Sequence, residues 1–304
     1  MSIVKLDDLL SINYQEKMKL AVVSAHDEEV LEAVVEAMRL GIVEPILIGD
    51  REKIQEILIE FKLNPDEFNI IHEKDLGKAA EIGVKLVSEN KADFLMKGLV
   101  DTGTLMKAVL NKEWGLRTDS LLSHVMVYEV GNYSKLIYLT DGGMNLYPNV
   151  EQKIKIIENA VQVVKTLGKD TVKVACLAAK EKEDPKMPAT VDAAALKKKF
   201  EEGGFSSGTI VEGPMALDLA ISKEAAQIKS FKSEVAGDAD ILLVPNIEMG
   251  NGIGKSITYF AGGKSAGIIM GAKVPIVLTS RADSHESKLY SIALGSVIAG
   301  KTFK

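Results

Sequence analysis

The sequence predicts an α/β protein built on largely parallel β-sheet, and the prediction rests on one repeated pattern. Short β-branched runs alternate with longer segments whose apolar residues recur at helical spacing. Such a βαβ succession implies parallel strands with helices on both faces of the sheet. With 304 residues, 46% of them hydrophobic, the chain is long enough for two α/β lobes or one large domain.

The first part of the chain shows the alternation most clearly. A strand is expected at 20–24, followed by an amphipathic helix over 27–40. Asp27 is typical of a helix start and Gly41 of a helix stop. The pattern continues with strands at 45–49, 68–71 and 92–97, separated by a helix that opens at Asp50 and by one that runs through Val87.

Two adjacent apolar strands then interrupt the alternation, at 124–130 and 135–140. The connection over 131–134 is so short that the two strands must be antiparallel. The best junction between two lobes therefore lies near Asp141. A second alternating block follows, with a helix over 150–167, strands at 172–178, 209–211, 240–244 and 274–279, and a last helix over about 285–299. From the pattern alone, the last strand and helix could complete either lobe.

Composition narrows the classes of function. A net charge of -6 and a pI near 5.5 argue against a nucleic-acid partner, although a local basic pocket for a small anion is still allowed. No apolar stretch approaches the ~20 residues that span a bilayer, and the amino terminus does not resemble a signal peptide. A single cysteine, Cys176, fits a reducing cytosol and is expected to be a buried strand residue. One cysteine and four scattered histidines give no zinc-type cluster.

Candidate binding loops follow predicted strands, where ligands bind in open α/β sheets. The segment 97–104, Lys-Gly-Leu-Val-Asp-Thr-Gly-Thr, enters a helix at Thr102 or Thr104. Glycine- and hydroxyl-rich turns at helix starts expose backbone N–H groups that suit phosphate. The alternative is that the two threonines only cap the helix.

A second candidate is the glycine-rich segment 250–256, Gly-Asn-Gly-Ile-Gly-Lys-Ser. It lacks the nucleotide phosphate-loop spacing, because the leading glycine would fall on Met249. It also lacks the dinucleotide fingerprint, because Lys255 occupies the place of the third glycine. What it offers is glycine flexibility beside a cation, which suits an anionic ligand.

The third candidate is 279–283, Thr-Ser-Arg-Ala-Asp, between an apolar strand and a helix. Its hydroxyl, guanidinium and carboxylate can hydrogen-bond an oxyanion, bind phosphate with a planar fork and accept a proton. The alternative is an Arg–Asp pair beside a helix capped by Asp283 or Ser284. His124 and His285 lie near no nucleophile in the sequence, so a structural or solvent-facing role is expected for both.

Several segments are distinctive when read together and in order. They are 91–98 (KADFLMKG), 110–118 (LNKEWGLRT), 122–125 (LSHV), 184–194 (DPKMPATVDAA), 212–218 (EGPMALD), 245–251 (PNIEMGN) and 274–284 (VPIVLTSRADS). In these segments the chain resembles the phosphate acetyl/butyryltransferase family, and within it the butyryltransferase branch. The resemblance runs from about residue 20 to the carboxyl end.

The resemblance implies two α/β lobes that face a cleft, as in the isocitrate/isopropylmalate dehydrogenases. The first lobe would comprise 1–140 plus 272–304, and the second 141–271. The implied reaction is acyl-CoA + phosphate ⇌ acyl phosphate + CoA, with butyryl-CoA as the expected substrate. It needs no metal and no nicotinamide, and coenzyme A takes part as a substrate or product. The resemblance also implies a cytoplasmic homodimer or higher homo-oligomer without a nucleic-acid or membrane partner.

Only some of the family's site residues have a matching residue in this chain. Ser280 and Arg281 match the Ser-Arg pair that is assigned to transition-state stabilisation and phosphate or carbonyl contact. The family's proposed catalytic aspartate lies seven residues past the serine, where this chain has Ser287, so Asp283 or Glu286 would have to act as the base. Asp283 is the expected one. The residues expected to hold phosphate and CoA are Lys97, Thr102, Lys107, Arg117, Asn145, Asn251 and Lys255.

Two further positions depart from the acetyl-specific relatives. Lys107 stands about where those relatives carry an arginine, and a lysine there loses bidentate phosphate geometry. Gly142 stands about where they carry a cysteine, and Cys176 is no substitute for it. Three rival functions stay open. One is an enzyme that mainly uses acetyl-CoA, another is a metal-dependent hydroxyacid dehydrogenase of the same fold, and the last is a non-catalytic CoA-binding sensor.

Overall fold

A computed structural model describes residues 3–12, 14, 16–280 and 282–302. The chain divides into two compact units. The N-terminal unit comprises Leu6–Ser120 and the chain from Ala266 onward, and the central unit comprises Leu121–Ser265 with the residues before Leu6. The units thus change near 120 and 265, whereas the sequence places the lobe boundaries at 140 and 271. The division into two lobes stays a prediction.

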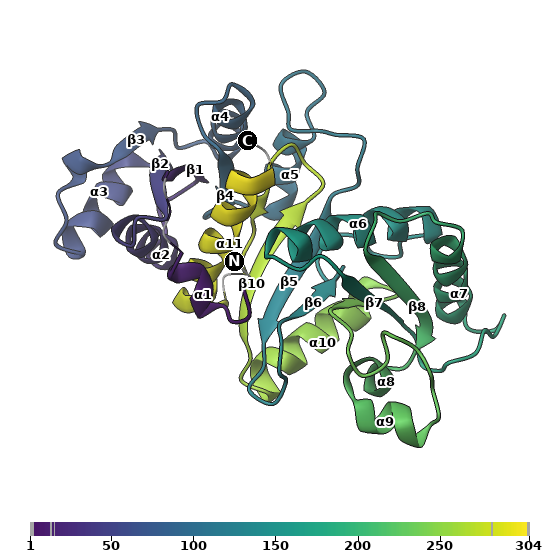
Figure 1. The fold of residues 1–304 in the computed structure, drawn as a ribbon. Helices are drawn as coiled ribbons and strands as arrows, with labels where there is room; N and C mark the ends of the chain where they lie inside the picture. Colours follow the sequence, from purple (N-terminus) through teal and green to yellow (C-terminus); the bar gives the residue numbers. More distant parts are fainter. Residues whose placement is uncertain (1–2, 13, 15, 281, 303–304) are drawn as a thin grey trace. The chain divides into compact units, whose positions relative to one another are not determined.

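The N-terminal unit is built on a mostly parallel sheet with the strand order β3-β2-β1-β4-β11-β10. All neighbouring strands are parallel except β10 and β11, which are antiparallel. The strands are β1 (Met18–Val23), β2 (Val43–Gly49), β3 (Asn69–His72), β4 (Phe94–Lys97), β10 (Lys264–Met270) and β11 (Ile276–Val277). The carboxyl ends of β1, β4 and β11 therefore meet at one edge of this sheet. The labels of β3, β2, β1 and β4 follow this strand order in Figure 1.

Helices cover both faces of this sheet because the direction in which successive strands are added to the sheet reverses after β3. The connections β1-α2-β2 and β2-α3-β3 add strands on one side of β1, whereas β3-α4-β4 returns to the other side of β1. Because such crossovers are right-handed, α4 lies on the opposite face of the sheet from α2 and α3. Accordingly, α2 packs against α3 and α11, and α4 packs against α5. The helices are α1 (Asp7–Leu10), α2 (Glu28–Arg39), α3 (Arg51–Glu60), α4 (Leu76–Ser88), α5 (Thr102–Val109) and α11 (His285–Thr302), with the 3-10 turn η1 (Pro65–Glu67).

Helix α2 shows how local sequence sets an element. The Asp27 carboxylate accepts a hydrogen bond from the Val30 N–H at 3.0 Å, which satisfies one donor that the first turn leaves without an intrahelical partner. The helix ends where Gly41 adopts a φ of +76°, a conformation that glycine takes at no steric cost. Both signals that the sequence predicted, Asp27 and Gly41, are confirmed.

The sheet strands of the central unit are also mostly parallel and follow the order β5-β6-β9-β7-β8. Strands β5 and β6 are antiparallel, as their short connection predicted, and the other pairs are parallel. The strands are β5 (Ser123–Glu129), β6 (Ile137–Thr140), β7 (Val172–Leu177), β8 (Thr209–Met215) and β9 (Ile241–Leu243). The helices are α6 (Val150–Thr166), α7 (Pro188–Glu201), α8 (Leu217–Ile221), α9 (Lys223–Ile228) and α10 (Ile247–Phe260).

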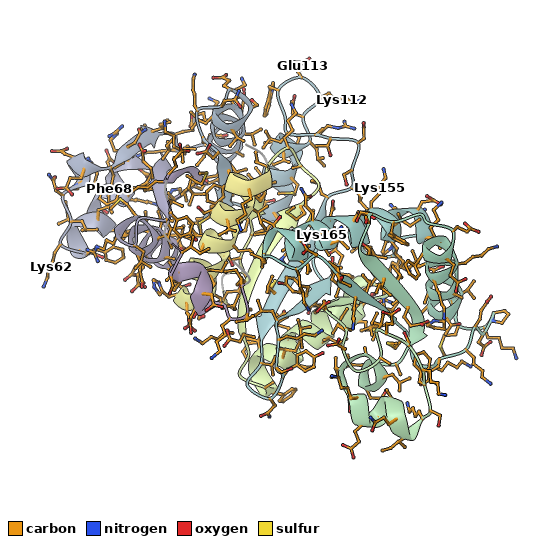
Figure 2. All side chains as sticks on the ribbon, viewed as in Figure 1. Lys62, Phe68, Lys112, Glu113, Lys155 and Lys165 are labelled. Carbon is orange, nitrogen blue, oxygen red and sulfur yellow. The ribbon has the colours of Figure 1, made fainter. Side chains whose placement is uncertain are left out.

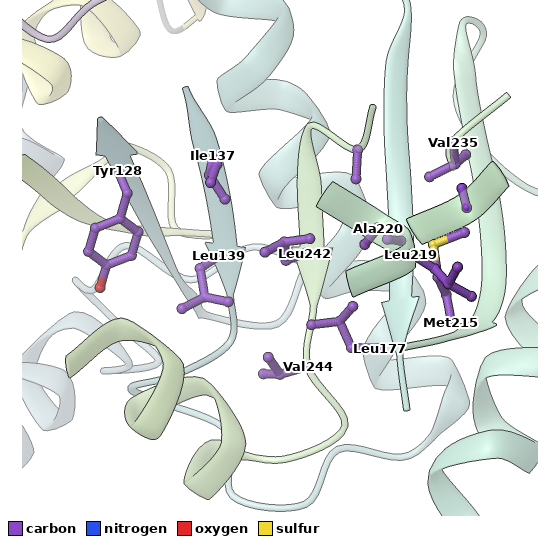
Figure 3. Packing of buried hydrophobic residues seen from close by; sticks show 13 residues of the cluster. Tyr128, Ile137, Leu139, Leu177, Met215, Leu219, Ala220, Val235, Leu242 and Val244 are labelled. Atoms are coloured by element: carbon purple, nitrogen blue, oxygen red, sulfur yellow. The ribbon is translucent and has the colours of Figure 1, made fainter. Parts of the chain in front are cut away.

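One face of this sheet forms an apolar core with the helices that cover it (Figure 3). Strand residues such as Leu139, Leu177 and Leu242 belong to one cluster with Leu219 and Ala220 of α8, and all are at most 2% exposed. Partly buried residues of α10, including Ile253 and Ile257, pack against the same cluster. This packing fixes α10 and the loop after β6, which carry several candidate site residues.

The sequence missed or misjudged three elements. Strand β10 was not predicted, and β11 is two residues long where six were expected at 274–279. The segment 250–256, expected to be a flexible loop, lies within helix α10. Within the described ranges, no helix is both long and apolar enough to cross a membrane.

Candidate functional site

A cavity of about 160 Å³ opens in the N-terminal unit at the carboxyl ends of β1, β4 and β11. One water molecule occupies roughly 30 Å³ in the liquid, so the cavity has room for a small polyatomic anion. This edge is where open α/β sheets bind ligands. The residues that line the cavity are Asp27, Glu29, Val30, Lys97, Gly98, Leu99, Thr279, Ser280 and Lys288.

Lys97 and the start of α2 set the charge of this cavity. Lys97 ends β4, and its ammonium group donates to the carbonyl oxygens of Gly98 at 3.2 Å and Val100 at 3.1 Å. Helix α2 begins at the cavity rim, where the carboxylates of Asp27 and Glu29, which also line the cavity, offset the positive end of the helix dipole. Both contributions come from elements of one sheet edge, as the sequence predicted for Lys97.

The backbone of the segment after β4 differs from the expectation. The N–H groups of Gly98 and Leu99 donate to the carbonyls of Val23 and Ser24, each at 2.8 Å, and that of Val100 donates to Gly98 at 2.9 Å. The first two donors therefore hold the loop against the end of β1, and the third closes a turn within the loop. Of the phosphate-binding groups expected in 97–104, the Lys97 side chain is the one that lines the cavity.

The start of α5 is where the sequence placed it, but the capping residue is different. The cap is Asp101, whose carboxylate accepts from the Thr104 N–H at 2.8 Å and the Thr104 hydroxyl at 2.5 Å. These hydrogen bonds, first the one from the hydroxyl, hold the pKa of Asp101 below its ordinary value. Thr102 is the first helical residue and does not line the cavity.

Ser280 and Asp283 form a closed turn between β11 and α11. The Asp283 carboxylate accepts from the Ser280 N–H at 2.7 Å, and the Asp283 N–H donates to the Ser280 carbonyl at 3.1 Å. Ser284, not Asp283, caps α11, because its hydroxyl accepts from the Ser287 N–H at 3.2 Å. The turn places Ser280 on the cavity wall. Arg281 lies outside the described residues.

Lys288 is a cavity residue that the sequence reasoning missed. It lies in the first turns of α11, and its side chain is only 2% exposed. Its ammonium group donates to the Glu29 carboxylate at 2.7 Å and to the Asp283 carbonyl at 2.5 Å. The available signal was its position directly before the long apolar run 289–299, because a helix that is apolar on all sides is buried.

Lys107 and Arg117 do not line this cavity. Lys107 is exposed on α5 and lines a second pocket of the N-terminal unit, of about 710 Å³, together with Asp101, Thr104 and Trp114. Arg117 is exposed in the segment after α5, beyond a loop whose tip carries Lys112 and Glu113 (Figure 2). The structure thus separates Lys107 from Lys97, which the sequence grouped as phosphate ligands.

The remaining predicted ligands belong to the central unit. Asn145 ends a tight loop after β6, and its amide N–H₂ group donates to the Leu122 carbonyl at 2.8 Å and to the Asp141 carboxylate at 2.6 Å. That carboxylate, only 2% exposed, also accepts from the N–H groups of Gly143 and Met144, both at 2.9 Å. Both donors of the Asn145 amide are therefore used to shape the loop.

Asn251 and Lys255 are both exposed on helix α10. Gly250 and Gly254 of this helix serve close packing, whereas Gly252 faces open space. A Cβ atom on Gly250 would lie 2.6 Å from the Cα of Gly142. A Cβ on Gly142 would lie 2.9 Å from the carbonyl carbon of Gly250, so the cysteine expected there in acetyl-specific relatives does not fit this backbone.

Two of the three glycines of α10, Gly250 and Gly252, make a matched test of this packing. Gly250→Ala is expected to lower the free energy of unfolding by about 1–3 kcal/mol, because the added methyl group overpacks against Gly142. Gly252→Ala is expected to be neutral or to raise it by up to about 1 kcal/mol, because no atom lies within 4 Å of its Cβ position. Urea unfolding of both variants measures the difference. Equal effects would contradict the close approach.

Cys176, His124 and His285 occupy positions that agree with the structural roles expected from the sequence. Burial raises the pKa of the Cys176 thiol to about 12, and the residue is only 1% exposed in β7. His285 contacts the Glu36 carboxylate through Nε2 at 2.5 Å, which ties α11 to α2. His124 lies in β5, its ring beside Gly143. Among the described residues, no three His, Cys, Asp or Glu side chains gather as a metal-binding group.

The fold and the cavity define an α/β protein with a small pocket, lined by two lysines and two carboxylates, at the carboxyl ends of parallel strands. A family model described as phosphate acetyl/butaryl transferase matches residues 72–296. The chain is 47% identical to phosphate butyryltransferase of Clostridium acetobutylicum, over 96% of this chain and 97% of that protein. It is 43% identical to phosphate acetyltransferase of Thermotoga maritima, over 97% and 99%. The chain belongs to the phosphate acetyl/butyryltransferase family, as the resemblance predicted.

Solved structures agree with the predicted α/β fold. A branched-chain phosphotransacylase from Enterococcus faecalis superposes with a TM-score of 0.82 at 35% identity, over 93% of this chain and 99% of that one. A 4-hydroxythreonine-4-phosphate dehydrogenase from Klebsiella pneumoniae has a TM-score of 0.56 at 14% identity, over 93% and 100%. The second likeness concerns the fold alone. The predicted fold class is confirmed.

Proposed function

We propose that this chain catalyses the reversible reaction of acyl-CoA and phosphate to acyl phosphate and CoA, with butyryl-CoA as its main substrate. The observation that carries the proposal is family membership over most of the chain, with higher identity to a butyryltransferase than to an acetyltransferase. The cavity of the N-terminal unit supports it, because two lysines and a serine hydroxyl suit a phosphate group.

In this proposal, phosphate is the nucleophile. It is held by Lys97 and by Arg281, whose planar guanidinium matches phosphate geometry. A phosphate oxygen attacks the thioester carbonyl and forms a tetrahedral intermediate with a negatively charged oxygen. The Ser280 hydroxyl accepts from the Ala282 N–H at 3.3 Å, so its own proton is left to donate to that oxygen. The C–S bond then breaks, giving acyl phosphate and the CoA thiolate.

The reaction also requires a base, and the proposal assigns this role to Asp283. In the reverse direction a base removes the proton of the CoA thiol, whose pKa should be near ~8.5 like that of a simple thiol. One oxygen of the Asp283 carboxylate already accepts from the Ser280 N–H. The proposal therefore assigns proton transfer to its other oxygen, Oδ1. The hydrogen bond between Ser280 and Asp283 supports this assignment, because it keeps the carboxylate close to the serine that is proposed to contact the oxyanion.

A panel of acyl-CoA substrates tests the proposal. Acetyl-CoA, butyryl-CoA and a branched-chain acyl-CoA are each supplied with phosphate, and CoA release is measured. We expect the highest kcat/KM with butyryl-CoA. A preference for acetyl-CoA would favour the first alternative. Tight CoA binding without CoA release from any of them would indicate a binding protein, and an absorbance change with a nicotinamide would indicate a dehydrogenase.

The expectations about CoA contacts and assembly also stay proposals. We infer that Thr102, Lys107, Arg117, Asn145, Asn251 and Lys255 contribute to CoA or phosphate binding in the assembled enzyme. We further infer a cytoplasmic homodimer or larger homo-oligomer, as the family resemblance implies. Analytical ultracentrifugation would determine the oligomeric state, and a sedimenting species of about 33 kDa would overturn it.

A further inference from the structure

The buried ammonium group of Lys288 occupies an unusual electrostatic position. The side chain is 2% exposed, and its carboxylate partner Glu29 is 60% exposed. A buried charge is retained only when it is paired, because removal from water is costly. Glu29 therefore neutralises Lys288 from the solvent side, across the wall of the cavity that both residues line.

The two partners differ in how easily they can leave the contact. Lys288 is held by packing within α11 and by its second hydrogen bond, to the Asp283 carbonyl at 2.5 Å. Glu29 lies in the first turn of α2 and can return its carboxylate to water at little cost, because most of its side chain is already solvated. An anion that enters the cavity thus meets a fixed cation with a displaceable counter-ion.

We propose that Lys288 is a phosphate-binding residue and that Glu29 is its internal competitor, which the incoming phosphate displaces. The inference rests on the proposed function, since it assigns phosphate to this cavity. Phosphate replaces one carboxylate on Lys288 and keeps the buried charge paired throughout. The Asp283 carbonyl links the same ammonium group to the Ser280 turn, so binding of phosphate and placement of the serine are coupled through one cation.

Steady-state kinetics with phosphate as the varied substrate test the exchange. Lys288→Met keeps an unbranched apolar chain of similar length and removes the charge. We expect it to raise KM for phosphate by about 10- to 100-fold, as for loss of a hydrogen bond to a charged group, with KM for acyl-CoA changed less than twofold. Glu29→Gln removes the competitor and is expected to lower KM for phosphate by about three- to tenfold.

A matched control and a double variant separate local exchange from general charge effects. Glu28→Gln makes the same charge change one residue away on α2, at a residue that does not line the cavity, and should leave KM for phosphate within about twofold. In the double variant Glu29→Gln/Lys288→Met, Glu29→Gln should no longer lower KM for phosphate, because the ammonium group for which Glu29 competes is absent. Thermal unfolding checks that each variant is folded.

Each outcome of these measurements decides the inference. An unchanged KM for phosphate in folded Lys288→Met overturns it, as does an equal effect of Glu28→Gln and Glu29→Gln. If Lys288→Met does not fold, the Glu29→Gln and Glu28→Gln pair decides alone. A wild-type enzyme that releases no CoA from any acyl-CoA would instead refute the proposed function, which is a different result.

Discussion

Ser280→Ala is expected to lower kcat by about 10²- to 10³-fold, with little change in KM for phosphate. The side-chain hydroxyl would be lost, but the turn should persist, because its hydrogen bonds with Asp283 use the backbone N–H and carbonyl of residue 280. The fall in kcat therefore measures the contribution of the Ser280 hydroxyl as a hydrogen-bond donor to the tetrahedral oxyanion. Initial rates of CoA release at saturating phosphate and acyl-CoA measure kcat.

A second serine variant controls for the loss of a hydroxyl in general. Ser88→Ala removes a hydroxyl that donates to the Lys85 carbonyl at the end of α4, and it should leave kcat unchanged within twofold. If Ser280→Ala retained wild-type kcat, the oxyanion role of Ser280 would be wrong. A rise in KM for phosphate alone would instead assign Ser280 to ground-state binding.

Gly98→Ala is expected to be the most destabilising single substitution at the cavity. A Cβ atom at this position would lie 2.4 Å from the Ser24 carbonyl oxygen and 2.6 Å from that of Val23. These atoms belong to backbone that cannot move aside as a side chain does, and they accept the Leu99 and Gly98 N–H groups. We expect the free energy of unfolding to fall by about 3 kcal/mol or more. Urea-induced unfolding followed by circular dichroism measures the loss.

The loss of stability at Gly98 should be accompanied by a loss of phosphate binding, because Gly98 and the neighbouring Lys97 line the cavity. Gly131→Ala is the matched control, since no atom lies within 4 Å of its Cβ position. That variant should unfold within about 0.5 kcal/mol of the wild type. A Gly98→Ala protein as stable as Gly131→Ala would show that the segments after β1 and β4 are further apart than the structure places them.

Local sequence signals predicted the regular elements where those signals have a short-range cause. Asp27 and Gly41 bound α2 because capping and the left-handed glycine conformation act within a few residues. The antiparallel pair β5 and β6 followed from the length of its connection. In each case the physical cause lies within the segment itself, so the sequence alone was sufficient.

The misjudged elements have long-range causes. Helix α10 contains glycines that favour a loop by propensity, but Gly250 is needed where the helix backbone meets Gly142. Strand β11 is short, and it is held by pairing with β4, 181 residues earlier in the chain (Ile276 with Leu95). Tertiary contacts of this kind override local preference, and no window of sequence contains them.

The same distinction applies to the candidate site. Ser280 and Asp283 share one turn, so their proximity could be predicted from spacing. The pairing of Lys288 with Glu29 joins residues 259 positions apart, and no spacing argument reaches it. Asn145 was expected to be a phosphate or CoA ligand, yet the N–H groups of its amide are used to hold its loop together. Sequence identified the segments, whereas the fold decides which atoms are available.

Burial of the only cysteine has a practical consequence for enzymology. Coenzyme A is a thiol, and its release is measured with reagents that react with thiolates. Cys176 is 1% exposed and its pKa is raised to about 12, so the folded enzyme should not consume such a reagent at neutral pH. The signal of the thiol reagent during turnover then reports the released CoA alone. A slow additional signal of one equivalent per chain would report unfolding during the assay.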